Sequence, residues 1–434
     1  MLLNNNLKIN ERGHLVFANA DTSLLAKEFG TPLKVLDKQG IKNNCKMYLG
    51  TLKKCFGKGA TAAYASKALS FVKLMELIKD TGMSVDVASI GEIYTAFLAG
   101  FDMSKVYYHS NYKSEQDIDY AINKGIGYFM VDNFEELDAI NNRVEALRKA
   151  KNDTKKQKVI LRIAPNVSVY THKKITTGIL DTKFGVSLYK AWDFIRKAQS
   201  LPNLILEGLH CHIGSQIFEI EPFIEAAKIM LRLIADTKIK IEKLVLGGGF
   251  AVRYVDTQKS MDYAKHIMDL STAMKEEANK LQITIPNIVL EPGRSIVAEN
   301  GISLYSVGVV KEVEGIRNYV IVDGGMTDNP RYALYESVYT VYNASRMHEP
   351  TDYEATVAGR ACESGDLIGE GFKIAKPKKG DLLAVMTTGA YTYSMASNYN
   401  RFLRPSIVMV DEKGDAELVV RRESLEDLMK LDIK

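Results

Sequence analysis

The chain has 434 residues, enough for two or three domains, and 46% of them are hydrophobic, enough for sizeable cores. Its 57 basic and 53 acidic residues leave a formal net charge of +4. Basic residues do not gather in a stripe with interleaved aromatics. This composition excludes a disordered or fibrous chain and gives no reason to expect nucleic acid as a partner.

The termini and the cysteines bear on the compartment. The stretch MLLNNNLKINERGHLVF lacks the regions of a signal peptide, and no run of roughly eighteen apolar residues occurs. The four cysteines are scattered without a CxxC pair: Cys45, Cys55, Cys211 and Cys362. We therefore expect a cytoplasmic protein with no membrane partner, no disulfide scaffold and no metal site built on cysteine.

Between residues 60 and 294, short β-branched runs alternate with longer stretches of helical spacing. Eight of these runs end in polar or glycine residues: TAAYASK (61–67), SVDVAS (84–89), VYYHSN (106–111), GYFMVDN (127–133), VILRIAPN (159–166), LEGLHCHIGS (206–215), KLVLGGGF (243–250) and NIVLEPGR (287–294). Eight repeats predict a parallel β/α barrel with its active site at the carboxyl ends of the strands. The alternative, an open doubly wound sheet, would usually need fewer repeats.

The remaining segments predict a long loop and a second domain. Residues 167–187 are too long for an ordinary connector, so we expect a loop over the active end of the barrel. After residue 301 the pattern changes to strand-like runs with polar turns, which predicts a mostly β domain. The run GHLVFAN (13–19) could pair with it. The expected division is a barrel at 34–294 and a discontinuous β domain formed by 1–33 and 295–434.

Lys67 closes a small-residue strand, and a lysine that is partly desolvated can attack a carbonyl because its pKa falls. Taken alone, a lysine at a strand end is more often a solvated cap. The other strand ends supply the context. Gly247, Gly248 and Gly249 leave three amides unobstructed for an anion such as phosphate, although a glycine triplet alone is more often a tight turn.

Two further strand ends add polar groups. In EPGR, Glu291 could keep a pyridine nitrogen protonated while Gly293 and Arg294 neighbour a phosphate. In HCHIGS, His210 and His212 share a strand face with Ser215 just beyond. Two histidines without a third ligand make a poor zinc site, so we expect an imidazole packed on an aromatic cofactor and no metal.

The ordered set of motifs resembles the fold-type III pyridoxal-phosphate decarboxylases, and within them the family that converts meso-diaminopimelate to L-lysine and CO2. The motifs cover nearly the whole chain: YASKA, DVASIGE, LRIAPNV, TGILDTKFGV, GLHCHIGSQ, GGGF, EPGR, VDGGMTDNPRYALY, ACESGD and GAYTYSMASNYN. The resemblance implies an alanine racemase-like barrel, pyridoxal phosphate as cofactor and a cytoplasmic homodimer with shared active sites.

The resemblance also assigns roles. Lys67 forms the Schiff base with the cofactor, and Cys362, supplied by the partner subunit, is the acid that protonates the carbanion after CO2 leaves. Taken alone, Cys362 would more often be a buried structural thiol. The residues implied to bind the cofactor are Lys67, His212, Ser215, Gly247, Gly248, Gly249, Glu291, Pro292, Gly293, Arg294 and Tyr391. Those implied to bind the substrate are Arg294, Arg331, Tyr335, Glu363 and Tyr391.

The charges of the residues implied to bind the substrate limit which amino acids the site could accept. A guanidinium prefers a carboxylate, and diaminopimelate carries both an amine and a carboxylate at its far end. Arg331, Arg294 and Tyr335 can hold that acid while Glu363 takes the amine. The alternative is a decarboxylase of this fold for lysine, ornithine, arginine or carboxynorspermidine, and Arg331 argues against the first three. A catalytically silent homologue would have no need of both Lys67 and Cys362.

The chain departs from the family pattern at several positions. Leu69 stands where asparagine is usual, Ile90 where glycine is usual, and HSNYKS replaces a run like HGNNKS. None of these changes removes a group with a named chemical role. Tyr332 replaces the proline that follows the substrate arginine, so its effect falls on the shape of the substrate pocket.

Overall fold

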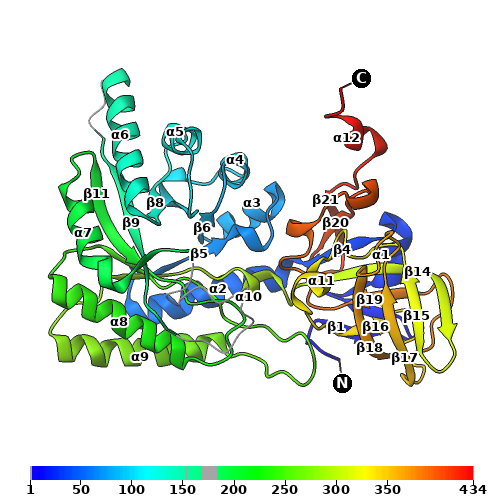
Figure 1. Cartoon of the computed structure of the whole chain (residues 1–434). Helices are drawn as coiled ribbons and strands as arrows, with labels where there is room; N and C mark the ends of the chain where they lie inside the picture. The colour runs from blue at the N-terminus through cyan, green and yellow to red at the C-terminus, as the bar shows by residue number, and fades with distance from the viewer. Residues whose placement is uncertain (1, 152–154, 168–182, 434) are drawn as a thin grey trace. The chain divides into compact units, whose positions relative to one another are not determined.

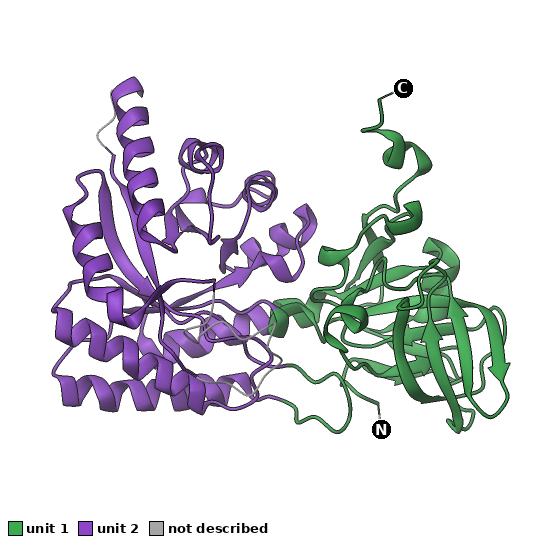
Figure 2. Cartoon of the chain, viewed as in Figure 1, with its two compact units in different colours: residues 1–43, 252–260, 294–434 green, residues 44–251, 261–293 purple. Residues whose placement is uncertain are grey.

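The computed structural model describes residues 2–151, 155–167 and 183–433 and divides the chain into two compact units (Figure 2). The unit of residues 44–251 and 261–293 is called the barrel unit. The unit of residues 1–43, 252–260 and 294–434 is called the β unit. In the described residues no helix is long and apolar enough to cross a membrane.

Eight parallel strands of the barrel unit close into a barrel, as predicted. In chain order they are β5 (Thr61–Ala65), β6 (Ser84–Val87), β7 (Val106–Tyr108), β8 (Tyr128–Val131), β9 (Gln157–Ala164), β11 (Leu204–His210), β12 (Lys243–Val245) and β13 (Asn287–Leu290). Each strand pairs with its neighbour in this order, and β13 pairs with β5 to close the ring. A short strand, β10 (Val186–Ser187), lies parallel to β9.

Helices connect these strands on the outside of the barrel (Figure 1). α2 (Lys38–Phe56) leads into β5, and the helices between successive barrel strands are α3 (Val72–Asp80), α4 (Ile90–Leu98), α5 (Glu115–Asn123), α6 (Phe134–Lys151), α7 (Ala191–Ser200), α8 (Glu221–Thr237) and α9 (Tyr263–Leu281). Local chemistry sets where they begin. Ser114 and Asp117 form a reciprocal capping box at the start of α5, and Ser89 accepts the N–H of Glu92 at the start of α4.

Alternate strand residues fill the interior of the barrel. Apolar side chains from six strands form one buried cluster: Ala63, Tyr107, Met130, Ile160, Val245 and Val289. Because successive strand residues face opposite sides, the intervening residues pack outward against the helices. The interior is therefore a packed core, and the polar groups collect at the strand ends.

The β unit is built on a sheet with the order β18-β17-β15-β14-β4-β20-β21. In addition, β19 pairs with β14, and β16 pairs with β19. Its strands are β4 (Leu33–Asp37), β14 (Gly301–Val313), β15 (Arg317–Val322), β16 (Val341–Asn343), β17 (Tyr353–Ala358), β18 (Leu367–Ile374), β19 (Leu382–Val385), β20 (Ser406–Val410) and β21 (Ala416–Val420). Four short helices belong to it: α1 (Thr22–Phe29), α10 (Arg294–Val297), α11 (Arg331–Tyr335) and α12 (Leu425–Met429).

The division of the chain differs from the expected ranges at three places. Residues 34–43 were assigned to the barrel, but β4 pairs antiparallel with β14 and parallel with β20. Residues 252–260 and Arg294 also belong to the β unit. Residues 34–43 were misassigned because β4 pairs with strands far along the chain, and a local sequence pattern does not reveal such a pairing.

The N-terminal run at 13–19 is also placed differently from the expectation. It forms β2 (Leu15–Phe17), which pairs with β1 (Leu7–Ile9) and β3 (Ala20–Asp21) in a separate three-stranded sheet. It joins the β unit through its core, where Leu15 and Phe17 pack with residues of β4, β14 and β20. Of the predicted loop at 167–187, residues 168–182 lie outside the described residues.

Candidate functional site

The polar groups of the barrel unit lie at the carboxyl ends of its strands. Lys67 follows β5 in a short 3-10 turn, Ser66–Ala68, and its side chain is exposed. The sequence suggested a partly desolvated amine at this position, and the structure instead leaves the residue accessible. Ser66 beside it is buried and donates its hydroxyl to Glu92 at 2.6 Å. The turn is therefore anchored at Ser66, while Lys67 stays accessible.

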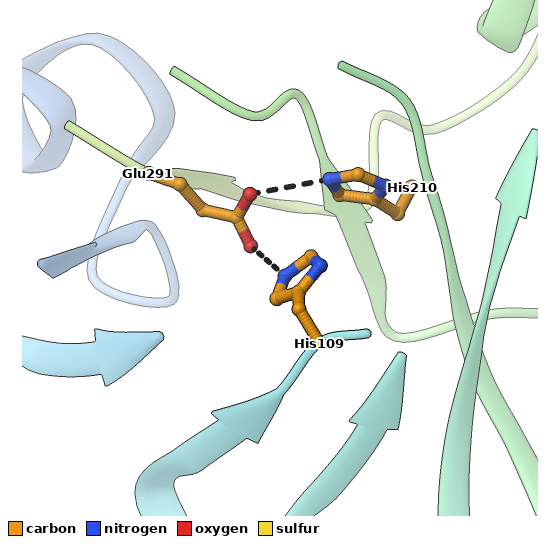
Figure 3. Close-up of side chains that lie close together, drawn as sticks. All are labelled: His109, His210 and Glu291. Atoms are coloured by element: carbon orange, nitrogen blue, oxygen red, sulfur yellow. Dashed lines mark hydrogen bonds and ion pairs between the residues drawn. The ribbon is translucent and has the colours of Figure 1, made fainter. Parts of the chain in front are cut away.

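Glu291 forms the centre of a buried polar cluster (Figure 3). It directly follows β13, and its two oxygens accept hydrogen bonds from His109 Nε2 at 2.8 Å and His210 Nε2 at 3.1 Å. His109 follows β7, and His210 ends β11. The two imidazoles meet edge to face, with ring centroids 4.9 Å apart. Three strand ends thus converge on one carboxylate.

The burial of this cluster sets its protonation. Burial raises the pKa of Glu291, but the electrostatic attraction to His109 and His210, together with their hydrogen bonds, outweighs it and holds the pKa well below its usual range. Burial lowers the pKa of His210 to about 4. The stable arrangement near neutral pH is an ionised Glu291 that accepts an N–H from a neutral His210.

Asp86 on β6 and Lys67 extend the cluster. Burial raises the pKa of Asp86 to about 6, against the lowering effect of the charges on His109 and Lys67. Burial also lowers the pKa of His212 well below its usual range, and the Lys67 charge adds to this effect. Lys67 therefore lies close enough to both Asp86 and His212 to influence their ionisation.

The glycine loop after β12 is pressed against its neighbours. A Cβ on Gly248 would lie 2.0 Å from the carbonyl oxygen of Glu291, and one on Gly249 would lie 2.3 Å from that of Gly214. Gly247 has φ of +63°, a conformation that glycine adopts without strain. The N–H of Gly248 donates to Nδ1 of His212 at 3.3 Å. A side chain on Gly248 or Gly249 would collide with the neighbouring backbone, so these positions require glycine.

His212 and Ser215 lie in the loop after β11, since the strand ends at His210. Contrary to the prediction from the sequence, the two histidines therefore do not share a strand, because β11 ends at His210 and His212 follows it. This loop runs beside the glycine loop: Ile217 pairs with Phe250 in an isolated parallel bridge. Ser215 is half-buried within it.

Pro292 and Gly293 connect the glutamate to the end of β5. The carbonyl of Pro292 accepts the N–H of Ala65 at 3.1 Å. A Cβ on Gly293 would lie 3.0 Å from that of Ala65. The segment that follows Glu291 is thus packed on the strand that ends at Lys67.

A second cluster lies within the β unit and joins two buried arginines. The guanidinium carbons of Arg294 and Arg331 lie 4.8 and 5.8 Å from the centroid of the Tyr391 ring. Arg294 also donates to the hydroxyl of Tyr254 at 2.6 Å, and Arg331 lies 5.0 Å from the ring of Tyr335. These cation–π contacts hold two like charges around one aromatic ring.

The backbone at Tyr391 and the side chain of Arg331 both carry unusual features. Tyr391 has φ of +56°, which is uncommon for a residue other than glycine and often marks a functional position. Arg331 is 7% exposed, and within the described residues its Nε has no hydrogen-bond partner. A buried guanidinium of this kind calls for an anion.

Cys362 and Glu363 lie on the segment between β17 and β18 of the β unit, and both are exposed. The N–H of Cys362 donates to Oδ1 of Asn400 at 2.7 Å. Glu363 accepts the N–H of Gly365 at 3.2 Å. The expectation of a buried structural thiol for an isolated cysteine does not hold at this position.

His109, Asp86 and Arg162 all belong to the barrel cluster, and none of them was assigned a role from the sequence. Arg162 on β9 is buried, and its NH1 lies 3.6 Å from Asp132. All three lie at strand ends that the sequence had identified, so their position was the available signal. His109, His210 and Glu291 offer ligand-type atoms within 4.8 Å of one another, and the two hydrogen bonds to Glu291 engage those atoms.

Comparisons with known proteins account for this arrangement. A family model described as pyridoxal-dependent decarboxylase, pyridoxal binding domain, matches residues 42–298. The chain belongs to the pyridoxal-dependent decarboxylases. This membership confirms the resemblance inferred from the motifs and identifies pyridoxal phosphate as the cofactor.

Among similar pyridoxal-dependent decarboxylases, a curated diaminopimelate decarboxylase of Staphylococcus aureus (strain COL) is 41% identical over 99% of this chain and 100% of the relative. A crystal structure of diaminopimelate decarboxylase from M. jannaschii with L-lysine has a TM-score of 0.91 and 34% identity, covering 100% of this chain and 99% of that one. The Helicobacter pylori enzyme with L-lysine has a TM-score of 0.85 and 29% identity, covering 95% and 99%.

The residues of the barrel unit fit this cofactor. The glycine loop has no room for side chains, and successive glycine amides of this kind can bind a phosphate. Glu291 is held as a carboxylate, which suits a partner that must stay protonated. Lys67 is an accessible amine beside Asp86 and His212.

Proposed function

We propose that this pyridoxal-dependent decarboxylase removes CO2 from meso-2,6-diaminopimelate and releases L-lysine, the last step of lysine synthesis by the diaminopimelate route. The main support for this choice of substrate is the buried Arg331, whose Nε lacks a hydrogen-bond partner in the part of the chain that the structure describes. A carboxylate at the far end of the substrate supplies the anion that this guanidinium requires. Lysine and ornithine have no such carboxylate.

In this proposal the cofactor is held by residues of the barrel unit, together with Arg294 and Tyr391 of the β unit. Lys67 binds it through its amine, and His212 packs on its ring. The loop of Gly247, Gly248 and Gly249, together with Ser215, binds the phosphate. Pro292, Gly293, Arg294 and Tyr391 complete the contacts. When bound, pyridoxal phosphate supplies an electron sink that accepts the electron pair left by the departing carboxylate.

Protons are handled by two side chains. Glu291, kept ionised by His109 and His210, holds a proton on the ring nitrogen of the cofactor. The Cys362 thiol delivers a proton to the carbon that has lost CO2, which replaces the broken carbon–carbon bond by a carbon–hydrogen bond. Arg294, Arg331 and Tyr335 bind the far carboxylate, and Glu363 binds the far amine.

The proposal includes a homodimer in which each subunit lends its Cys362 and Glu363 to the site of its partner. Its support is the family resemblance and the exposure of both residues on the β unit. We also propose a cytoplasmic location, which is supported by the four free cysteines, since oxidising compartments favour disulfides.

A product assay tests the substrate. Purified protein with pyridoxal phosphate is incubated separately with meso-diaminopimelate, lysine, ornithine and arginine, and CO2 and amine products are measured. We expect lysine from diaminopimelate and little product from the others. Preferred decarboxylation of lysine, ornithine or arginine would replace the proposed substrate.

Lys67→Ala tests the cofactor site. We expect loss of the visible absorbance band of the bound cofactor and loss of turnover, because no other residue supplies this amine in the proposal. Lys73→Ala, a change at an exposed lysine on α3, is the control and should leave both unchanged. If Lys67→Ala keeps the band and the turnover, the assignment of Lys67 is wrong.

A further inference from the structure

Two segments of the β unit carry residues that the proposed function assigns to the substrate. Residues 323–330 follow β15 and lead into α11, which begins at Arg331. Residues 359–366 link β17 to β18 and include Cys362 and Glu363. Asp366 is the last residue of the second segment, and only 3% of it is exposed. It is a buried acid with no role so far.

The carboxylate of Asp366 serves both segments, with one oxygen for each. Oδ1 accepts the N–H of Met326 at 2.6 Å, and Oδ2 accepts the N–H of Ala361 at 2.7 Å. The backbone N–H of Asp366 also donates to the carbonyl of Glu363 at 3.1 Å. Ala361 immediately precedes Cys362, so Asp366 fixes the backbone one residue before the thiol.

Both segments have a glycine where they pack against this carboxylate. A Cβ on Gly325 would lie 2.3 Å from Oδ1 of Asp366, and a Cβ on Gly359 would lie 2.2 Å from Oδ2. The Cβ on Gly325 would also lie 2.8 Å from Cα of Gly359. Neither position has room for a side chain, so the two segments are packed around an acceptor with two oxygens.

The first segment has a second attachment that is independent of Asp366. Asp328 accepts the N–H of Gly325 at 3.3 Å, and its other oxygen lies 2.8 Å from Nζ of Lys34 on β4. The segment before Arg331 is therefore tied to the central sheet, and the Cys362 segment is tied to it through Asp366.

We propose that Asp366 is a positioning residue for the decarboxylation, which fixes the Cys362–Glu363 segment against the segment that leads to Arg331. This inference rests on the proposed function. Proton transfer requires the donor within hydrogen-bond reach of the accepting atom, so a small displacement of Cys362 slows the step. The substrate contact at Arg331 keeps its own support from Asp328.

Asp366→Asn tests the inference with almost no change in volume. An amide offers one acceptor oxygen and an NH2 group, so one of the two backbone donors loses its partner. In the holoenzyme we expect hydrogen exchange at the amides of Met326 or Ala361 to rise at least ~10-fold. We expect kcat to fall roughly 10-fold because Cys362 is displaced, and KM for diaminopimelate to rise because Glu363 lies on the same segment, while the visible cofactor band is retained.

The control is Asp352→Asn, which changes an exposed aspartate of the same unit and should alter none of these quantities. A variant Asp366→Asn that loses thermal stability but keeps the wild-type kcat would overturn the positioning role. If that variant does not fold, the wild-type holoenzyme decides, because exchange at Met326 and Ala361 as fast as at exposed loop amides would also overturn it. Absence of diaminopimelate turnover in the wild type would refute the proposed function, whereas the exchange rates would still test the link between the segments.

Discussion

At the scale of single residues, the protonation of His210 follows from what surrounds each of its ring nitrogens. Nε2 donates to Glu291, so in a neutral imidazole Nδ1 carries the lone pair. Nδ1 is buried and has no hydrogen-bond partner among the described residues. A second proton at Nδ1 would be buried without an acceptor, which agrees with a pKa lowered by burial to about 4.

This predicts acid sensitivity that comes from His210. An unfolded histidine titrates near pH 6.5, so the folded and unfolded states bind equal numbers of protons at this site above that pH. As the pH falls from 6.5 to 4, only the unfolded state takes up the proton, and stability is lost. His210→Gln removes this term. We expect the wild type to lose about 3 kcal/mol more than the variant over this window.

The measurement is denaturant unfolding at a series of pH values, followed by the fluorescence of Trp192. This single tryptophan lies on α7 of the barrel unit and therefore reports on the unit that contains His210. Asp86 contributes in the opposite sense, since its pKa is raised by burial to about 6, but it is present in both proteins and cancels from the difference. Parallel pH profiles for the two proteins would show that His210 is not held neutral.

At the scale of elements, the sequence predicts the barrel well because each barrel strand pairs with the strand that comes next to it in chain order. The eight runs that end in polar residues are the eight barrel strands. β4 was assigned to the wrong unit because its partners, β14 and β20, lie hundreds of residues away. His109 was overlooked for a similar reason, because its hydrogen-bond partner Glu291 lies 182 residues further along the chain.

The misassigned strand β4 contains a buried ion pair whose contribution to the free energy of unfolding can be predicted. Lys34 is 3% exposed, and its Nζ lies 2.8 Å from Asp328 and 2.7 Å from the hydroxyl of Ser303. Lys34→Met fills a similar volume but leaves Asp328 as a buried charge without its cation. We expect a loss of about 3–5 kcal/mol in the free energy of unfolding of the β unit.

Circular dichroism during denaturation measures this loss. Lys311→Met, at an exposed position on β14, should change stability by less than about 0.5 kcal/mol. The double variant Lys34→Met/Asp328→Asn should recover part of the loss, because the uncompensated charge is then removed as well. Equal stability of Lys34→Met and the wild type would mean that the ion pair contributes nothing.

At the scale of the whole molecule, the proposed homodimer divides each site between two subunits. Fold, cofactor and family could be predicted from motifs because these depend on residues within one chain. The dimer could be inferred only from resemblance, since an interface between copies leaves no periodic signal in composition. Cys362 and Glu363 are exposed on the β unit, as residues lent to another subunit would be in an isolated chain.

Mixed dimers test this division. Lys67→Ala and Cys362→Ala should each be inactive alone, or nearly so, because each homodimer has the same defect in both sites. A heterodimer of the two, purified through two different affinity tags, places the intact Lys67 and the intact Cys362 in one site. We expect about half of the wild-type activity per dimer, since one of two equivalent sites is complete.

The matched control is a second heterodimer, for which the two arrangements of the site predict the opposite activities. A heterodimer of wild type with the double variant Lys67→Ala/Cys362→Ala leaves each shared site with one defect, so it should be inactive. If each chain instead built its own site, this second heterodimer would keep about half of the activity and the first would have none. The two heterodimers contain the same substitutions in equal number, so a difference between them can arise only from which subunit supplies Cys362 to which Lys67.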